Sequence, residues 1–242
     1  MLRVSLRVAG LILLFLVCLP LHLISKWVFG NSPWPRRFLA SVGWILGTRV
    51  KPVSEPIRPH SLLVANHTSW LDIIVLAGAT GCTFVSKDDL GHGFIHWLAD
   101  QNHTIYVRRS DRKGARDQAR AIAGGLERTQ PVALFPEGTT GPGDRLLPFR
   151  STLLEAAAFV SKEVAVRPVA IDYGPAAREV GWFEEGGKDN VLRILGRKGT
   201  LTATVRLLEP LDPSLDRKAM ARAAHDAIAA ALAPSGIAPA GL

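Results

Sequence analysis

SLLVANHTSWLDIIVLAG, residues 61–78, predicts a short buried β-strand that passes within a few residues into an α-helix. The apolar run 61–65 has the length of a strand, and Ser69 is a favourable residue for the start of a helix over 69–79. The same alternation continues along the chain. We expect further strands at 82–86, 104–108, 131–135, 164–171 and 201–208, and further helices at 90–100, 111–129, 149–161 and 214–233. This pattern predicts an α/β fold with a mixed, largely parallel sheet flanked by helices.

The first 50 residues have a different composition from the rest. VAGLILLFLVCLPLHLI (8–24) and FLASVGWILG (38–47) are apolar, and three tryptophans, Trp27, Trp34 and Trp44, are spread through the region. We therefore expect the α/β fold to be preceded by an N-terminal membrane motif of two short helices. These helices would be partly sunk in one leaflet, with tryptophans near the headgroups. A single N-terminal anchor helix is the alternative.

The segment KPVSEPIRPH (51–60) carries three prolines and reads as a linker. We accordingly divide the chain into membrane-associating helices at 1–50 and an α/β domain at 51–242. Within that domain, residues 174–200 have the weakest pattern and are expected to form a loop or a lid.

Composition limits the partners and the kinds of site. Lysine and arginine exceed aspartate and glutamate by 29 to 21, a net charge of +8, which suits an anionic bilayer or an acidic partner. No nucleic-acid motif accompanies this charge, so we expect no nucleic-acid partner. Cys18 and Cys82 do not make a disulfide framework. His92 and His96 are four residues apart but lack nearby carboxylates or thiols, so we assign them to helix packing and expect no metal.

The junction quoted above holds His67 and, five residues later, Asp72. Side chains five apart in an unbroken helix do not meet, so the pair requires His67 to lie just outside the helix. With Ser69 as the N-cap, Asp72 is the third helical residue, and its carboxylate points back toward the helix start. It can then accept a proton from one ring nitrogen of His67 and make the other nitrogen a stronger base. The alternative is a favourable first-turn acid beside an unrelated loop histidine.

A second stretch, ALFPEGTTGPGDRLLPFR (133–150), follows a predicted strand. Glu137 is the only charge directly after that strand, at the edge where α/β sheets place ligands. Gly138 and Thr139 follow it, and glycine lets the backbone approach a substrate closely. A P-loop is excluded because no lysine followed by serine or threonine has the required spacing. A tight turn with an incidental acid is the alternative.

Together, NHTSWLD (66–72) and FPEGTT (135–140) resemble the glycerolipid acyltransferase family, the bacterial PlsC-like 1-acyl-glycerol-3-phosphate acyltransferases. HTIYVRR (103–109) is similar to the arginine block of that family, where Arg109 matches the arginine and His103 stands in place of the usual glycine. VRPVAI (166–171) is similar to its proline block. The resemblance covers about residues 60–171.

One position departs from the family pattern in the second motif. Thr140 stands where the family often has arginine, and Arg145 or Arg150 could supply that charge. The resemblance also ties this block and the arginine block to phosphate binding, so both departures bear on the acceptor headgroup.

The resemblance implies direct acyl transfer from a thioester to a lipid hydroxyl. His67 would take the hydroxyl proton as general base, and Asp72 would orient the imidazole and stabilise its charged form. Acyl-coenzyme A or acyl carrier protein would supply the acyl group as a substrate, so no resident cofactor is expected. The leading acceptor is a lysophospholipid, 1-acyl-glycerol-3-phosphate, which gives phosphatidic acid. Lyso-ornithine lipid is the alternative acceptor, and a thioesterase or a non-catalytic membrane lipid-binding module are alternatives of other classes.

The remaining candidate site residues would bind substrate. Arg108 and Arg109 suit a bidentate grip on a phosphate. Glu137, followed by Gly138 and Thr139, would hydrogen-bond an acceptor hydroxyl or hold an arginine in place. Membrane lipids are the expected surroundings, and the expected location is the cytoplasmic face of the cell (inner) membrane.

Overall fold

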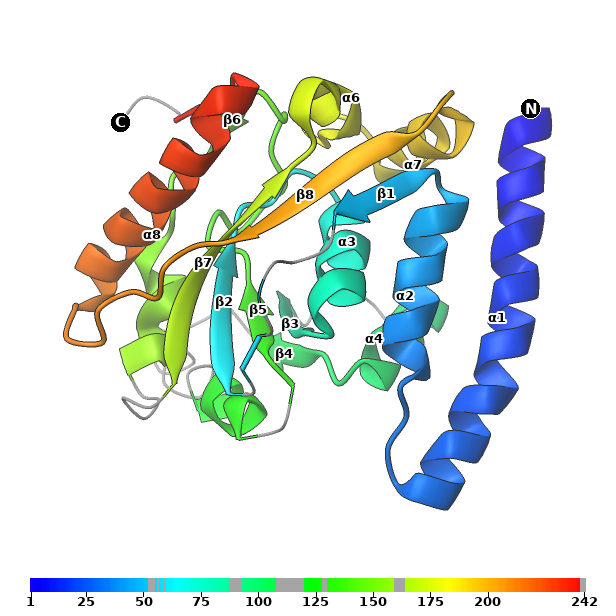
Figure 1. Ribbon diagram of the computed structural model, residues 1–242, viewed down its shortest axis with the longest axis horizontal. Helices are drawn as coiled ribbons and strands as arrows, with labels where there is room; N and C mark the ends of the chain where they lie inside the picture. Colours follow the sequence, from blue (N-terminus) through cyan, green and yellow to red (C-terminus); the bar gives the residue numbers. More distant parts are fainter. Residues whose placement is uncertain are drawn as a thin grey trace.

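The computed structural model describes residues 1–51, 55, 57–58, 60–87, 93–107, 120–127, 130–158 and 164–239. Its centre is a seven-stranded sheet in the order β1-β8-β7-β2-β5-β3-β4 (Figure 1). The strands are β1 (Thr48–Lys51), β2 (Ser61–Ala65), β3 (Thr83–Lys87), β4 (Ile105–Val107), β5 (Val132–Leu134), β7 (Ala165–Asp172) and β8 (Leu201–Leu207). All neighbouring strands are parallel except β7 and β8. The expected mixed, largely parallel sheet is therefore confirmed.

Helices cover both faces of this sheet. Strand β2 is buried along its whole length, with Leu63 and Ala65 in one hydrophobic cluster and Leu62 and Val64 in the other. In Figure 1, α8 lies on one face and α2 and α3 lie on the other. The α-helices with described bounds after the N-terminal pair are α3 (Leu71–Thr80), α4 (Phe94–Gln101), α6 (Ala177–Val180), α7 (Gly187–Gly196) and α8 (Arg217–Leu232), and residues 120–126 are also helical. Short 3-10 helices are η1 (Ser151–Ala158), η2 (Gly174–Ala176) and η3 (Ala233–Ser235), and β6 (Arg145–Leu146) pairs with β9 (Ala238–Pro239) in a separate small sheet.

Several elements differ from expectation. Residues 174–200 were expected to be a loop or lid, but they contain η2, α6 and the ten-residue helix α7. The expected helix over 149–161 is a 3-10 helix in its described part. Strand β1 was not expected and lies across the predicted boundary at residue 50, where it pairs in parallel with β8. The strand depends on pairing with β8, which is distant in the sequence, and no apolar pattern within its four residues predicts it.

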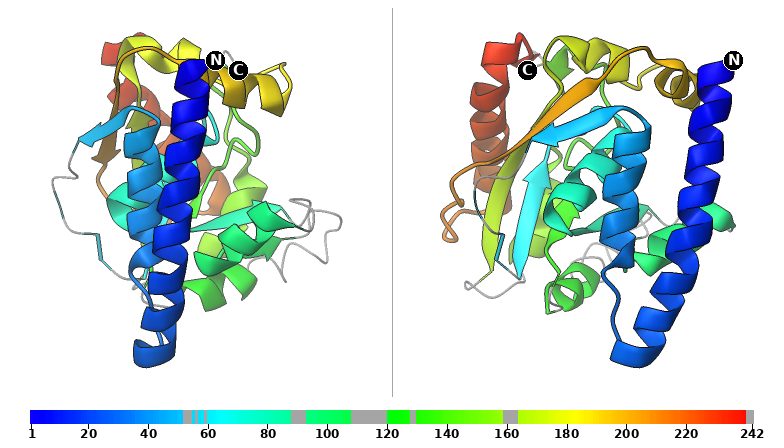
Figure 2. Two further views of the ribbon diagram at one scale, coloured as in Figure 1. Left: turned by 90° about the vertical axis from the view of Figure 1, so that its right-hand side faces the viewer. Right: turned by 45° about the vertical axis from the view of Figure 1, so that its right-hand side comes forward.

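The N-terminal segment forms two helices, α1 (Leu2–Phe29) and α2 (Trp34–Ile45), as expected in number. The expectation that both are short is wrong for α1, which runs for 28 residues through Pro20 and is long and apolar enough to cross a membrane. Figure 2 shows α1 at the side of the molecule. Many of its large apolar side chains are exposed: Leu2, Leu6, Ile12, Leu13, Leu16, Val17, Leu23, Ile24, Trp27, Val28 and Phe29.

Helix α2 joins this pair to the α/β domain by packing closely on α3. A Cβ atom added to Gly78 would lie 3.0 Å from the Cα atom of Ala40, so glycine is needed where the two helices approach. Helix α2 is therefore packed against the same helix that carries Asp72.

Candidate active site

Three neighbouring strands deliver the candidate site residues to one edge of the sheet. Strands β7, β2 and β5 are adjacent and parallel, and His67 follows β2, Glu137 follows β5 and Tyr173 follows β7. The carboxyl ends of parallel strands are the usual place for a ligand site in an α/β sheet. This topology gathers residues that are far apart in sequence.

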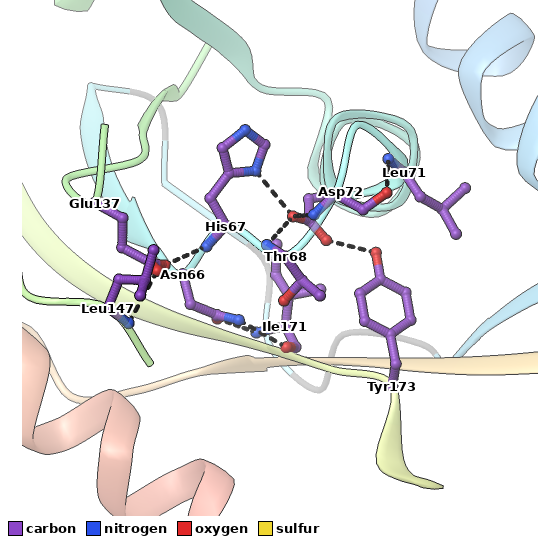
Figure 3. A network of polar contacts seen from close by, with 10 residues as sticks. Asn66, His67, Thr68, Leu71, Asp72, Glu137, Leu147, Ile171 and Tyr173 are labelled. Atoms are coloured by element: carbon purple, nitrogen blue, oxygen red, sulfur yellow. Dashed lines mark hydrogen bonds and ion pairs between the residues drawn. The ribbon is translucent and has the colours of Figure 1, made fainter. Parts of the chain in front are cut away.

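His67 and Asp72 are in contact, as their spacing predicted. His67 lies in the loop between β2 and α3, and its Nδ1 atom is 2.9 Å from Oδ2 of Asp72 (Figure 3). Because a carboxylate accepts hydrogen bonds, Nδ1 carries the proton of this bond and Nε2 is left with a lone pair. In Figure 3 the Nε2 side of the ring points away from Asp72. The His67 side chain is 16% exposed and that of Asp72 is 0% exposed, so only the histidine is open to a substrate.

The carboxylate of Asp72 is held by donors on both oxygens. Besides His67, Oδ2 accepts hydrogen bonds from the backbone amides of Thr68 at 2.6 Å and Ser69 at 2.8 Å. The Ser69 hydroxyl accepts in turn from the amide of Leu71 at 3.3 Å, but α3 begins at Leu71 with Trp70, and not the predicted Ser69, as its N-cap. These bonds turn the carboxylate back toward the loop that carries His67.

Tyr173 supplies the donor to the second oxygen and was not predicted from the sequence. Its hydroxyl donates to Oδ1 of Asp72 at 2.6 Å from a buried position. Burial, and then the charge of Asp72, raise the pKa of Tyr173 well above 10, so the hydroxyl stays protonated and keeps donating. Asp72 is 101 residues away in the sequence, and no motif marks Tyr173 as its partner.

Glu137 makes two backbone contacts that were not predicted from the sequence. Its Oε1 atom accepts from the backbone amide of His67 at 2.6 Å, and Oε2 accepts from the amide of Leu147 at 3.1 Å. No contact to an arginine is found among the described residues, and the Glu137 side chain is buried. The carboxylate therefore braces the backbone of the histidine loop. The following turn adds a second brace, because the Gly141 amide donates to the carbonyl of His67 at 2.8 Å.

The two residues after Glu137 are more accessible. Gly138 has a φ of 74°, a left-handed conformation that favours glycine at this turn. Thr139 is exposed beside it. Arg145 lies 3.9 Å from Asp144 and over the ring of Phe183, so its charge is already engaged.

Replacing Glu137 by glutamine is expected to change how stability depends on pH. Burial is the main cause that raises the pKa of Glu137 to about 8, the charge of Asp72 adds to it, and the two backbone hydrogen bonds oppose it. The folded state therefore holds the proton more tightly than the unfolded chain, whose group titrates near 4.5. It follows that the free energy of unfolding of the wild type falls as pH rises from about 4.5 to about 8.

The measurement is thermal unfolding in detergent, followed by tryptophan fluorescence, from about pH 5 to about pH 9. Glutamine keeps one acceptor and loses the titration, so the midpoint of Glu137→Gln should rise relative to the wild type as pH increases. The exposed Glu127, changed to glutamine, is the control and should follow the wild type. A constant difference between Glu137→Gln and the wild type across this range would contradict the prediction.

Not all of the residues singled out in the sequence fall within the described ranges. Arg108, Arg109 and His92 lie outside the described residues. His96 contacts Asp100 through Nδ1 at 3.2 Å and stacks on Tyr106. Among the described ranges there is no group of three or more histidine, cysteine, aspartate or glutamate side chains able to hold a metal ion.

An apolar cavity of about 260 Å³ lies between the N-terminal helices and the α/β domain. Its walls include Phe15, Cys18 and Phe38 from α1 and α2, Ile73 from α3 and Phe84 from β3. Ile73 directly follows Asp72 in the chain, so one wall residue of the cavity is the sequence neighbour of the carboxylate that contacts His67.

Aromatic rings connect this cavity to His67. Phe84 stacks on Phe135 with ring centroids 5.8 Å apart, and Phe135 stacks on the imidazole of His67 at 4.0 Å. Phe135 and Glu137 both belong to the second motif, FPEGTT. This motif therefore supplies the ring that stacks on His67 and the carboxyl group that accepts from the His67 backbone amide. The site thus combines a polarised histidine with an adjoining apolar space.

Comparisons with known proteins agree with the resemblance seen in the motifs. The family model described as Acyltransferase matches residues 48–172. A lyso-ornithine lipid O-acyltransferase from Rhodobacter capsulatus is 31% identical over 247 residues, covering 93% of this chain and 88% of that protein. A 1-acyl-sn-glycerol-3-phosphate acyltransferase from Neisseria gonorrhoeae is 33% identical over 120 residues, covering 49% of this chain and 46% of that protein.

One solved structure shows the same fold. The crystal structure of the 1-acyl-sn-glycerophosphate (LPA) acyltransferase PlsC from Thermotoga maritima matches with a TM-score of 0.61 at 18% identity, covering 92% of this chain and 94% of that chain. The family match spans more than half of the 242 residues, and the Rhodobacter relative spans nearly all of them. These findings confirm the family suggested by the motifs. The chain belongs to the acyltransferase family of enzymes.

Proposed function

We propose that this enzyme transfers a fatty acyl group from a thioester to the hydroxyl of a lysolipid, with His67 as the general base. The observation that carries the proposal is the His67–Asp72 pair, in which Nδ1 is bonded to a buried carboxylate and the side chain is open on its other side. The acceptor hydroxyl gives its proton to Nε2 as its oxygen attacks the thioester carbonyl. The tetrahedral intermediate then expels the thiolate, which takes the proton back from the imidazolium.

We propose lyso-ornithine lipid as the acceptor. The support is the Rhodobacter relative with that printed activity, whose similarity extends over 93% of this chain. Lysophosphatidic acid is the second candidate, favoured by the match of Arg109 to the arginine block and by the Neisseria relative over 49% of the chain. Arg108 and Arg109 suit either acceptor, because guanidinium groups grip carboxylates and phosphates alike.

The acceptor is tested by a competition assay in detergent with mass-spectrometric detection of the products. One acyl thioester is offered with lyso-ornithine lipid and lysophosphatidic acid together, to the wild type and to Arg109→Ala. Acylated ornithine lipid should dominate. Arg109→Ala should raise the KM for the phosphate-bearing lysophosphatidic acid more than for the zwitterionic lyso-ornithine lipid, while the exposed-surface control Arg222→Ala changes neither. Phosphatidic acid as the main product would reverse the order of the acceptors, and thioester hydrolysis alone would favour a thioesterase.

The apolar cavity is the proposed slot for a fatty acyl chain. It opens beside the aromatic rings that stack toward His67, and its lining is almost entirely apolar. A chain held there would place its carboxyl end toward the base, in a space whose surface is mostly apolar.

Filling this slot should shorten the acyl chain that the enzyme prefers. Cys18 is buried and lines the cavity, whereas its neighbour Val17 on α1 is 51% exposed. Cys18→Phe should lower the rate with long-chain thioesters relative to short-chain ones by about tenfold, because the lost burial of about two methylenes weakens binding. Val17→Phe is the matched control and should keep the wild-type preference. Equal chain-length profiles for both variants would place the acyl chain elsewhere.

We further propose that α1 and α2 hold the enzyme on the cytoplasmic face of the inner membrane. The support is the length of α1 and the large exposed apolar side chains along it, together with the net charge of +8. Trp27 and Trp44 are largely exposed, as suits residues at the headgroup level. The same positive charge suits an acidic acyl carrier protein or the phosphates of coenzyme A as the donor.

A further inference from the structure

Helix α7 lies against the loop that carries His67, although nothing in the sequence marked it as part of the site. The contact is made by Asn190, which is 0% exposed. The indole Nε1–H of Trp70 donates to Oδ1 of Asn190 at 2.8 Å. Trp70 is the last residue before α3 and follows directly on Ser69, one of the amide donors to Asp72. A side chain of α7 therefore holds the loop between the candidate base and its orienting carboxylate.

The orientation of the Asn190 amide is fixed by its other contacts. Its Nδ2 atom donates to the carbonyl of Gly181 at 3.0 Å and to Oε1 of Glu185 at 2.8 Å. A rotated amide would set its oxygen against two acceptors and its amino group against the Trp70 N–H. Only one orientation of the Asn190 amide makes all three of these hydrogen bonds, and in that orientation Oδ1 accepts from Trp70.

The segment before α7 adds contacts to both loops of the site. The backbone amide of Trp182 donates to the carbonyl of Thr68 at 3.0 Å and to that of Gly141 at 3.1 Å. Close packing accompanies these bonds, because a Cβ atom on Gly181 would lie 2.3 Å from the carbonyl oxygen of Pro142. The loop after β2 and the loop after β5 are therefore fastened to the same segment.

The far end of α7 is fastened to the N-terminal helix α1. Nη1 of Arg7 donates to the carbonyls of Ile194 at 3.0 Å, Leu195 at 2.8 Å and Arg197 at 3.0 Å. These carbonyls lie at the C-terminal end of α7, where backbone acceptors lack partners within the helix and a cation is favourable. Helix α7 is held at one end by α1 and at the other by the loop of the candidate base.

We propose that Asn190 is a positioning residue for acyl transfer, acting through Trp70 on the loop from His67 to Asp72. The inference rests on the proposed function of His67 and deepens it. With Trp70 held, the amides of Thr68 and Ser69 stay directed at Asp72, and the imidazole keeps its orientation. Loss of the Asn190–Trp70 bond allows this loop other conformations, so fewer molecules have the base in place when substrate is bound.

The test compares Asn190→Leu, Trp70→Phe and the double variant in the full-length enzyme in detergent micelles. Each single change should lower kcat by about tenfold, the equivalent of one lost buried hydrogen bond, with KM for both substrates within about twofold of the wild type. The double variant should be no slower than the slower single variant, because both remove the same bond. The pH midpoint of kcat/KM should also move, since the environment of the base changes.

Asp216→Ala is the control for a general loss of stability. Asp216 caps α8 by accepting from the amides of Lys218 and Ala219, away from the site, so its loss should lower the thermal midpoint but leave kcat and the pH profile unchanged. The proposal is overturned if Asn190→Leu and Trp70→Phe behave like Asp216→Ala, or if their effects on kcat multiply in the double variant. If Asn190→Leu does not fold, Trp70→Phe decides alone. A fully active His67→Ala would instead remove the proposed function.

Discussion

The His67→Ala variant should have a turnover number lower by at least about a hundredfold, with folding and membrane binding intact. General bases usually contribute about 10²–10⁴-fold, and no second histidine contacts Asp72 among the described residues. The loop should keep its shape without the imidazole, because the His67 backbone is held by Glu137 and Gly141 through bonds that alanine keeps. The effect should therefore fall on kcat rather than on the thermal midpoint.

The measurement is acyl transfer at saturating thioester and acceptor, with His225→Ala as the matched histidine control. His225 lies on α8 and packs edge-on against Phe149, so its loss should change the rate little. Near-normal turnover by His67→Ala would show that another group accepts the hydroxyl proton. A loss of rate matched by a loss of folded protein would leave the base role without support.

The local part of this site could be predicted from the sequence. The strand at 61–65 and the contact between His67 and Asp72 both depend on residues within about one helical turn of each other. The sheet class was also predictable, because alternation of apolar strands and helices leaves few arrangements that bury both. Local propensity and the fold agree at each of these positions.

The rest depends on contacts that no local pattern encodes. The four residues of β1 gain their partners from β8, about 150 residues later in the chain. Helix α7 begins at Gly187 and buries only two apolar side chains, Ile194 and Leu195, beside the polar Asn190. Its position depends on Arg7 and on Asn190. The contacts of Tyr173 and Glu137 could not be predicted either, because their partners follow a different strand of the sheet.

Four donors converge on Asp72, which indicates that its charge and its orientation both matter. His67, Thr68 and Ser69 donate to one oxygen, and Tyr173 donates to the other. A buried carboxylate with so many donors has little freedom to turn, so the imidazole that it holds is pre-organised before substrate binds. The negative charge becomes most valuable when His67 takes up a proton, because the two charges are then 2.9 Å apart in a buried setting.

Changing Asp72 to asparagine separates these two contributions and should lower kcat by about 10²–10⁴-fold. The amide oxygen can still accept from the backbone of Thr68 and Ser69, so the loop should keep its shape, while the charge that stabilises the imidazolium is gone. Asp72→Ala removes both, and we expect it to be as slow but clearly less stable, because buried donors are left without an acceptor. Thermal midpoints and kcat for the two variants, measured side by side in detergent, check this. If Asp72→Asn retained most of the wild-type rate, hydrogen bonding by a neutral group would suffice, and the role of Asp72 would be to orient His67 rather than to stabilise its charge.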